Sequence, residues 1–223
     1  MKDSPPPIPP SRTPNDDEWR FRTITLPCEW IEDYRPGGYH PVHLGDIFNN
    51  GQYKVIRKLG EGSYSTVWLT HDLNCKSCTT LPKVAPVEGG RYIAQLLDEF
   101  KRSGPNDIHT CPVFEPMGPS VYTMSLQALV FLHENNIAHG AFQPGNILFV
   151  LDDINSMPED VLQQEQNVQS RSISDLVQRL DGKRDLWAPQ YLCVAQPLVP
   201  FTPCAEGFKI KLSDMGGGWY DPM

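Results

Sequence analysis

Apolar positions along this chain form short strand-like runs and one longer helical run. Residues 53–58 (YKVIRK) and 209–212 (KIKL) predict strands, and a further apolar run covers residues 147–149. Residues 125–135 place apolar side chains at 126, 129 and 130 and again at 128, 131 and 132, which predicts a helix with two faces to bury. The chain is therefore expected to be α+β.

A glycine-rich segment, residues 59–69 (LGEGSYSTVWL), follows the first predicted strand. Gly60 and Gly62 have no Cβ, so a hairpin turn here can bring backbone N–H groups close to phosphate oxygens. Ordinary hairpins also contain Gly-x-Gly, so this segment alone leaves a phosphate site and a plain turn about equally open. The candidate nucleotide contacts are Leu59, Gly60, Gly62, Ser63 and Val67, the last of which would lie against an adenine ring.

Residues 139–146 (HGAFQPGN) have the layout His-x-Asp-x-Lys-x-x-Asn of a catalytic loop for phosphoryl transfer. In that layout the aspartate accepts the proton of the attacking hydroxyl, and the asparagine holds Mg²⁺. Here Ala141 stands at the aspartate position and Gln143 at the lysine position, while Asn146 is kept. Because alanine cannot accept a proton and glutamine carries no charge, we expect transfer to be absent or slower by orders of magnitude.

Asp214 follows the last predicted strand, in the sequence Ser-Asp-Met-Gly. An isolated Asp-Met-Gly would usually be only a turn. Its place after the other two segments suggests that Asp214 and Asn146 together supply oxygen ligands for Mg²⁺, with phosphates and water completing the coordination.

In this order the three segments resemble a protein kinase, and further segments resemble the SR-protein kinase family. Residues 34–48 (YRPGGYHPVHLGDIF) are similar to the start of that family, residues 93–100 to its fourth strand, and residues 111–118 to its fifth strand and hinge. The form of the catalytic loop and the Ser-Asp-Met-Gly ending resemble a fungal branch. The resemblance covers roughly residues 28–149 and 207–218, with gaps.

The resemblance implies a protein-kinase-like bilobal fold with ATP and Mg²⁺ as cofactors. It also implies hinge contacts to the nucleotide from Glu115 and Met117. Members of the family phosphorylate serines in Arg-Ser repeats of splicing factors. The implied partners are therefore Arg-Ser-rich proteins or a partner kinase.

Several parts of the family pattern are missing. The 20 residues between Asp72 and Ile93 are too few for both the lysine-bearing third strand and the helix whose glutamate pairs with that lysine. Lys83 and Glu88 are the nearby substitutes. The helix after the hinge is also missing, and the chain ends before an activation segment. We therefore expect a truncated, degenerate copy with an incomplete fold, a small β-rich lobe plus the start of the helical lobe.

We expect five regions along the chain. They are a disordered proline-rich tail (1–27), a kinase-like small lobe with glycine-rich loop and hinge (28–118), the start of the large lobe with the catalytic loop (119–149), an insertion (150–206), and a strand with Asp-Met-Gly (207–223). Within the insertion, residues 161–166 and 172–180 predict helices. The apolar stretch 187–192 is expected to pack on the small lobe.

Composition limits which classes of binding partner and which cellular compartment we expect. A net charge of −8 and a pI near 5.2 do not favour direct binding of nucleic acid or of an anionic membrane, but they suit Arg-rich peptides. The sequence shows no membrane span and no apolar signal region. Cys75 and Cys78 would need two more ligands to bind zinc, and only His71 is near. The six scattered cysteines fit free thiols, so we expect a cytoplasmic or nuclear protein.

Three functions remain open from the sequence. The chain could be an active serine/threonine kinase, which the loss of the base at Ala141 opposes. It could be a non-catalytic pseudokinase module that binds Mg-nucleotide weakly, or binds a partner without chemistry. It could also be a non-functional truncated product, which the missing internal segments favour. We expect kinase ancestry with catalytic activity lost or severely impaired.

Overall fold

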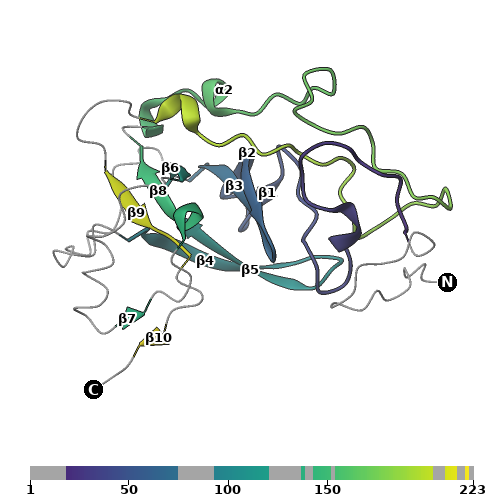
Figure 1. Cartoon of the computed structure of the whole chain (residues 1–223), viewed down its shortest axis with the longest axis horizontal. Coiled ribbons are helices and arrows are strands. Elements are labelled where there is room, and N and C mark those ends of the chain that lie inside the picture. The colour runs from purple at the N-terminus through teal and green to yellow at the C-terminus, as the bar shows by residue number, and fades with distance from the viewer. Residues whose placement is uncertain are drawn as a thin grey trace. The chain divides into compact units, whose positions relative to one another are not determined.

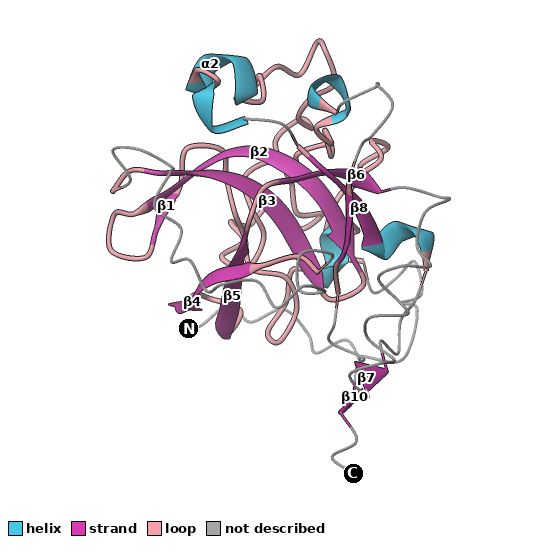
Figure 2. Cartoon of the chain, turned by 90° about the vertical axis from the view of Figure 1, so that its left-hand side faces the viewer, coloured by secondary structure: helices cyan, strands magenta, loops and turns pink. Residues whose placement is uncertain are grey.

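In this computed structural model, the described residues are 19–74, 93–120, 137–138, 143–151, 154–202, 209–214 and 219–220. They are rich in strands and poor in helices, as expected for an incomplete kinase small lobe (Figures 1 and 2). The helix predicted at 125–135 lies outside the described residues. No described helix has both the length and the apolar character that a membrane span requires.

The chain divides into two compact units. The first, unit 1, contains the described residues of Met1–Asn74, Lys101–Cys111 and Glu159–Gln196. The second, unit 2, contains those of Cys75–Phe100, Pro112–Pro158 and Pro197–Met223. The strands are β1 (Ile47–Phe48), β2 (Tyr53–Gly62), β3 (Ser65–Asp72), β4 (Leu96–Ser103), β5 (Ile108–Phe114), β6 (Met117–Ser120), β7 (Ile137–Ala138), β8 (Ile147–Val150), β9 (Ile210–Leu212) and β10 (Trp219–Tyr220). The helices are α2 (Glu159–Leu162) and the 3-10 turns η2 (Ile31–Asp33), η4 (Pro144–Asn146), η5 (Ile154–Ser156) and η6 (Val199–Phe201).

Unit 1 is built on the antiparallel sheet β1–β2–β3. The strand predicted at residues 53–58 is confirmed, and it continues to Gly62. β2 and β3 pair from Tyr53↔Asp72 to Gly62↔Ser65, with register shifts between Val55 and Arg57 and between Lys58 and Gly60. Unit 1 also contains two apolar clusters. One contains Phe21, Ile31, Tyr34, Tyr39 and Leu192, and the other contains Val42, Leu44, Val55, Ile173 and Cys193.

The packed part of unit 1 begins earlier than residue 28, the boundary that the sequence suggested. Arg20 and Phe21 are only 5% and 2% exposed. Glu32 explains this, because its carboxylate accepts hydrogen bonds from Arg20 Nε at 2.8 Å and from the backbone N–H groups of both residues at 2.7 and 2.9 Å. A paired carboxylate and guanidinium can be buried at far lower cost than either alone.

Most of the insertion belongs to unit 1, but its two predicted helices are not formed as expected. α2 ends at Leu162 because the N–H of Gln164 donates to Ile56 O of β2 at 2.8 Å instead of continuing the helix. Residues 172–180 form no helix. The N–H groups of Ser174 and Val177 donate instead to the carbonyls of Leu192 and Gln190, each at 2.8 Å. Tertiary partners outweigh weak helix propensity here.

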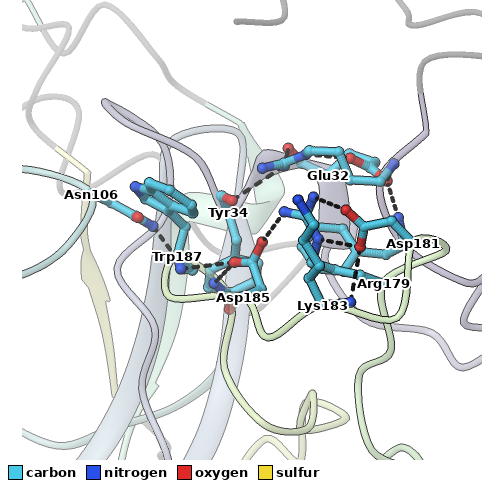
Figure 3. Close-up of polar contacts among 11 residues, drawn as sticks. Glu32, Tyr34, Asn106, Arg179, Asp181, Lys183, Asp185 and Trp187 are labelled. Carbon is cyan, nitrogen blue, oxygen red and sulfur yellow. Dashed lines mark hydrogen bonds and ion pairs between the residues drawn. The ribbon is translucent and has the colours of Figure 1, made fainter. Parts of the chain in front are cut away.

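The apolar stretch 187–192 packs as predicted. Leu192 is 1% exposed in the first apolar cluster, and Ala188 packs against the same cluster. Asn106 Nδ2 donates to the carbonyl of Trp187 at 2.9 Å (Figure 3). Nearby, Arg179 holds the loop with ion pairs to Asp181 at 2.6 Å and Asp185 at 3.0 Å (Figure 3).

Unit 2 is built on the sheet β6–β8–β9. The strand predicted at 209–212 is confirmed as β9, and the apolar run at 147–149 lies in β8. The two strands pair antiparallel from Ile147↔Leu212 to Phe149↔Ile210. Ile147 and Leu212 are 1% and 0% exposed, so this pair forms the centre of the local core. β7 pairs with β10, and β4 pairs with β5 in separate two-stranded sheets.

Candidate nucleotide site

The glycine-rich segment forms a tight hairpin in unit 1. Gly62 ends β2, and the exposed residues Ser63 and Tyr64 make the turn before Ser65 begins β3. A Cβ built on Gly60 or Gly62 would meet no atom within 4 Å. The turn is therefore uncovered at both glycines, and phosphate binding there remains a prediction.

The other two predicted contacts in the hairpin differ in exposure. Val67 pairs with Gly60 across the two strands and is 51% exposed, so its methyl groups are available to an apolar ring. Leu59 is half-buried. Both lie on the strands that carry the turn, but a contact between either residue and a nucleotide remains a prediction.

A buried ionic network surrounds Lys58 of β2. Lys58 is fully buried, and its ammonium donates to Glu29, to Glu61 at 2.9 Å and to the carbonyl of Cys193 at 3.0 Å. Burial by itself would lower the pKa of Lys58, but the charge of Glu29 and the hydrogen bonds to both carboxylates raise it. Tyr34 completes the network by donating to Glu29 at 2.5 Å.

In unit 2 the structure brings together Asn146 and Asp214, which the sequence separates by 68 positions. Asn146 Nδ2 donates a hydrogen bond of 3.2 Å to an Asp214 carboxylate oxygen. The pairing Ile147↔Leu212 explains this, because Asn146 directly precedes β8 and Asp214 closely follows β9. Ser213 locks the junction, since its N–H donates to Asn146 O at 2.8 Å.

The chemistry of this pair suits a hard cation. Asp214 is exposed and has φ +60°, a left-handed conformation that aspartate tolerates. An amide oxygen and a carboxylate oxygen are ligands that Mg²⁺ accepts, with phosphate and water oxygens for the remaining positions. Among the described residues, no cluster of three or more His, Cys, Asp or Glu side chains could hold a metal by itself.

The two predicted hinge contacts lie in unit 2 as well. The carboxylate of Glu115 is engaged by the Lys211 ammonium and by the N–H of Gln95 at 2.8 Å. Met117 is 8% exposed and pairs with Val150 across β6 and β8. Because the Glu115 side chain already has partners, a nucleotide contact there would fall to its backbone.

Of the two catalytic-loop substitutions, only Gln143 lies among the described residues. Gln143 is exposed, and its carbonyl accepts the N–H of Asn146 at 3.0 Å, which closes the turn η4. Ala141 lies outside the described residues, as do Lys83 and Glu88, the suggested substitutes for the missing ion pair, and the pair Cys75 and Cys78.

Sequence reasoning did not assign roles to several residues that shape the hairpin. Three of them are near the segments described above: Lys58, Glu29 and Tyr39. Only Lys58 gave a hint in the sequence, as a charged residue at the end of the apolar strand predicted at residues 53–58. Gln164 gave none. It lies 106 positions from Lys58, yet its side-chain oxygen accepts the Lys58 N–H at 2.9 Å.

Comparison with known proteins agrees with the motifs. No protein-family model matches the chain. The chain is 33% identical over 169 residues to "Protein kinase dsk1" of Schizosaccharomyces pombe, covering 56% of this chain and 31% of that protein. It is also 33% identical over 169 residues to human "SRSF protein kinase 3", covering 55% of this chain and 29% of the relative. This chain is a relative of the SR-protein kinases.

This SR-protein kinase relative spans about a third of the length of the curated proteins it matches. The SKY1 serine/threonine-protein kinase of Saccharomyces cerevisiae is 28% identical over 181 residues, covering 60% of this chain and 24% of that protein. Yeast and human relatives match equally well, so the fungal branch remains a prediction. A solved kinase domain aligns with a TM-score of 0.45 and 19% identity, covering 83% of this chain and 56% of that domain's chain.

Proposed function

We propose that this chain is a Mg-nucleotide-binding module of the SR-protein kinase type in which phosphoryl transfer is lost or severely impaired. The observation that carries the proposal is the approach of Asn146 and Asp214 to 3.2 Å in unit 2. The open glycine turn of unit 1 supports it, because a hairpin without Cβ atoms at Gly60 and Gly62 suits phosphate.

In this proposal the chain's own residues divide the work of binding. Asn146 and Asp214 would hold Mg²⁺, which neutralises phosphate charge when it is bound. Backbone N–H groups at Ser63 and its neighbours would face the phosphate oxygens of ATP. By resemblance to protein kinases, Val67 of unit 1 and the hinge residues Glu115 and Met117 of unit 2 are the candidate contacts to the base.

The same residues argue against efficient chemistry. A hydroxyl substrate needs a base within hydrogen-bond reach, and Ala141 offers no such group. Gln143 lacks the positive charge that would stabilise a transferring phosphoryl group. With nucleotide binding retained and the base absent, the module would act by binding, either to Arg-Ser-rich proteins or to a partner kinase. The net charge of −8 suits an Arg-rich partner.

Thermal unfolding with and without Mg-ATP tests the binding proposal. A ligand that binds only the folded state must raise the unfolding temperature. We expect Mg-ATP to raise it for the wild-type protein and Asp214→Asn to remove most of that rise, because one carboxylate ligand is lost. Asparagine also tolerates a left-handed φ, so the variant adds little strain. Asp175→Asn, an exposed aspartate of the insertion, is the matched control and should keep the rise.

Restoration of the base tests the catalytic half of the proposal. Ala141→Asp should produce phosphotransfer to an Arg-Ser peptide if the rest of the site is assembled. No Mg-ATP effect on the wild type would instead favour a non-functional product. Measurable phosphotransfer by the wild type at rates typical of kinases, about 1–100 per second, would contradict the proposed impairment.

A further inference from the structure

The tip of the glycine hairpin is held by one tyrosine from a distant segment. Tyr39 Oη donates a hydrogen bond of 2.6 Å to the carbonyl of Gly62, 23 positions further along the chain. Gly62 is the last residue of β2, immediately before the turn at Ser63 and Tyr64. Both turn residues are exposed, Tyr64 to 97%, so side-chain packing does little to hold the turn.

Tyr39 itself is firmly placed. It is 9% exposed in the first apolar cluster, with its ring centroid 5.7 Å from that of Tyr34. Its N–H donates to Asp33 O at 3.1 Å, and its carbonyl accepts from Asn106 Nδ2. Asn106 in turn donates to the Trp187 carbonyl (Figure 3). The tyrosine therefore ties the exposed turn to the fixed interior of unit 1.

The contact from Tyr39 also fixes the direction of the next backbone N–H group, because the peptide between Gly62 and Ser63 is planar. The C=O of Gly62 and the N–H of Ser63 belong to one planar trans peptide, so they point in opposite directions. When Tyr39 holds the carbonyl toward the core, the Ser63 N–H must point away from it. A Cβ on Gly62 would meet nothing within 4 Å, and Ser63 is exposed, so other atoms do not cover the turn at these two residues.

The hydroxyl remains a donor at neutral pH. Burial raises the pKa of Tyr39, and the charges of Asp33, Glu29 and Glu61 raise it further. The contact therefore persists under ordinary conditions.

We infer that Tyr39 is a positioning residue that orients the Ser63 amide toward the phosphates of a bound nucleotide. This inference rests on the proposed nucleotide binding and names a determinant of it. It predicts that loss of the Tyr39 hydroxyl weakens binding only through the phosphate groups of the ligand. The affinity for adenosine, which has no phosphate groups, should not depend on the orientation of the Ser63 peptide.

The test compares Tyr39→Phe with Tyr34→Phe by titrating each with Mg-ATP and with adenosine. Tyr34→Phe is matched, because it removes a buried hydroxyl from the same apolar cluster, one that donates to Glu29 and not to the turn. For Tyr39→Phe we expect Mg-ATP affinity to fall roughly three- to tenfold, the effect of one hydrogen bond, while adenosine affinity is unchanged. For Tyr34→Phe we expect the ratio of the two affinities to stay at the wild-type value.

Equal losses for both ligands, or no loss, in Tyr39→Phe would overturn the inference. If the wild type binds neither ligand, the proposed function fails, and amide hydrogen exchange then judges the positioning role alone. Faster exchange of the Ser63–Ser65 amides in Tyr39→Phe than in Tyr34→Phe would support the tie. Equal exchange in the two variants would refute it.

Discussion

Lys58 shows how a single buried charge can be retained in the strand that leads to the glycine turn. Its ammonium contacts two carboxylates and a carbonyl, and no part of its side chain reaches solvent. Removing one partner of a buried ion pair leaves the other charge without compensation. Lys54 lies on the same strand, but its side chain is 32% exposed, and it pairs with Glu159 at 2.6 Å near the surface.

We therefore predict that Lys58→Ala lowers the free energy of unfolding by about 3–5 kcal/mol, because it strands the buried Glu29 carboxylate. Lys54→Ala should lower it by only about 0.2–1 kcal/mol, as is usual for exposed pairs. Urea unfolding of both variants measures the difference. Similar losses in the two variants would mean that the buried network contributes no more than a surface pair.

At the scale of elements, the insertion forms backbone hydrogen bonds with the hairpin strand β2. The N–H of Gln164 donates to Ile56 O, and the N–H of Gln196 donates to Lys58 O, both at 2.8 Å. Arg57 Nε donates to the carbonyl of Leu162 at 2.6 Å. The Gln164 side chain adds bonds to the N–H of Lys58 at 2.9 Å and to the carbonyls of Ser172 and Val194, each at 3.0 Å.

Gln164→Ala should therefore destabilise the protein by about 1–3 kcal/mol, because it leaves buried backbone groups unpaired. It should also speed hydrogen exchange at the Lys58 amide. Gln163→Ala changes the neighbouring, exposed glutamine and should stay within about 0.5 kcal/mol of the wild type. An unchanged Lys58 amide in Gln164→Ala would show that this side chain does not pair with β2 in solution.

At the scale of the whole molecule, segments far apart in the sequence build one core in unit 1. Leu192 of the insertion is 1% exposed among Phe21, Tyr34 and Tyr39 of the N-terminal region. We predict that Leu192→Ala costs about 2–5 kcal/mol and lowers hydrogen-exchange protection in the β2–β3 hairpin as well as in the insertion. Leu176→Ala, at a position 67% exposed, is the control. Loss of protection confined to the insertion would show that the insertion folds separately.

The sequence by itself determined the ancestry and the order of the functional segments. Strands at 53–58 and 209–212 follow from local patterns of apolar residues. The glycine turn, Asn146 and Asp214 follow from residue types whose chemistry is independent of context. The comparisons agree with this ancestry, with 33% identity over 169 residues to two SR-protein kinase relatives. The substitution at Ala141 is likewise a matter of sequence alone.

Only the tertiary structure decided what surrounds those segments. The N–H of Gln164 bonds to β2 rather than to its own helix, and residues 172–180 bond to residues 190–194, so two predicted helices gave way to long-range partners. Arg20 is buried because Glu32 meets it, and Tyr39 reaches Gly62 across 23 positions. Local propensity amounts to tenths of a kcal/mol per residue, whereas each buried polar group must find a partner. The folded chain supplies those partners, and no local pattern in the sequence records them.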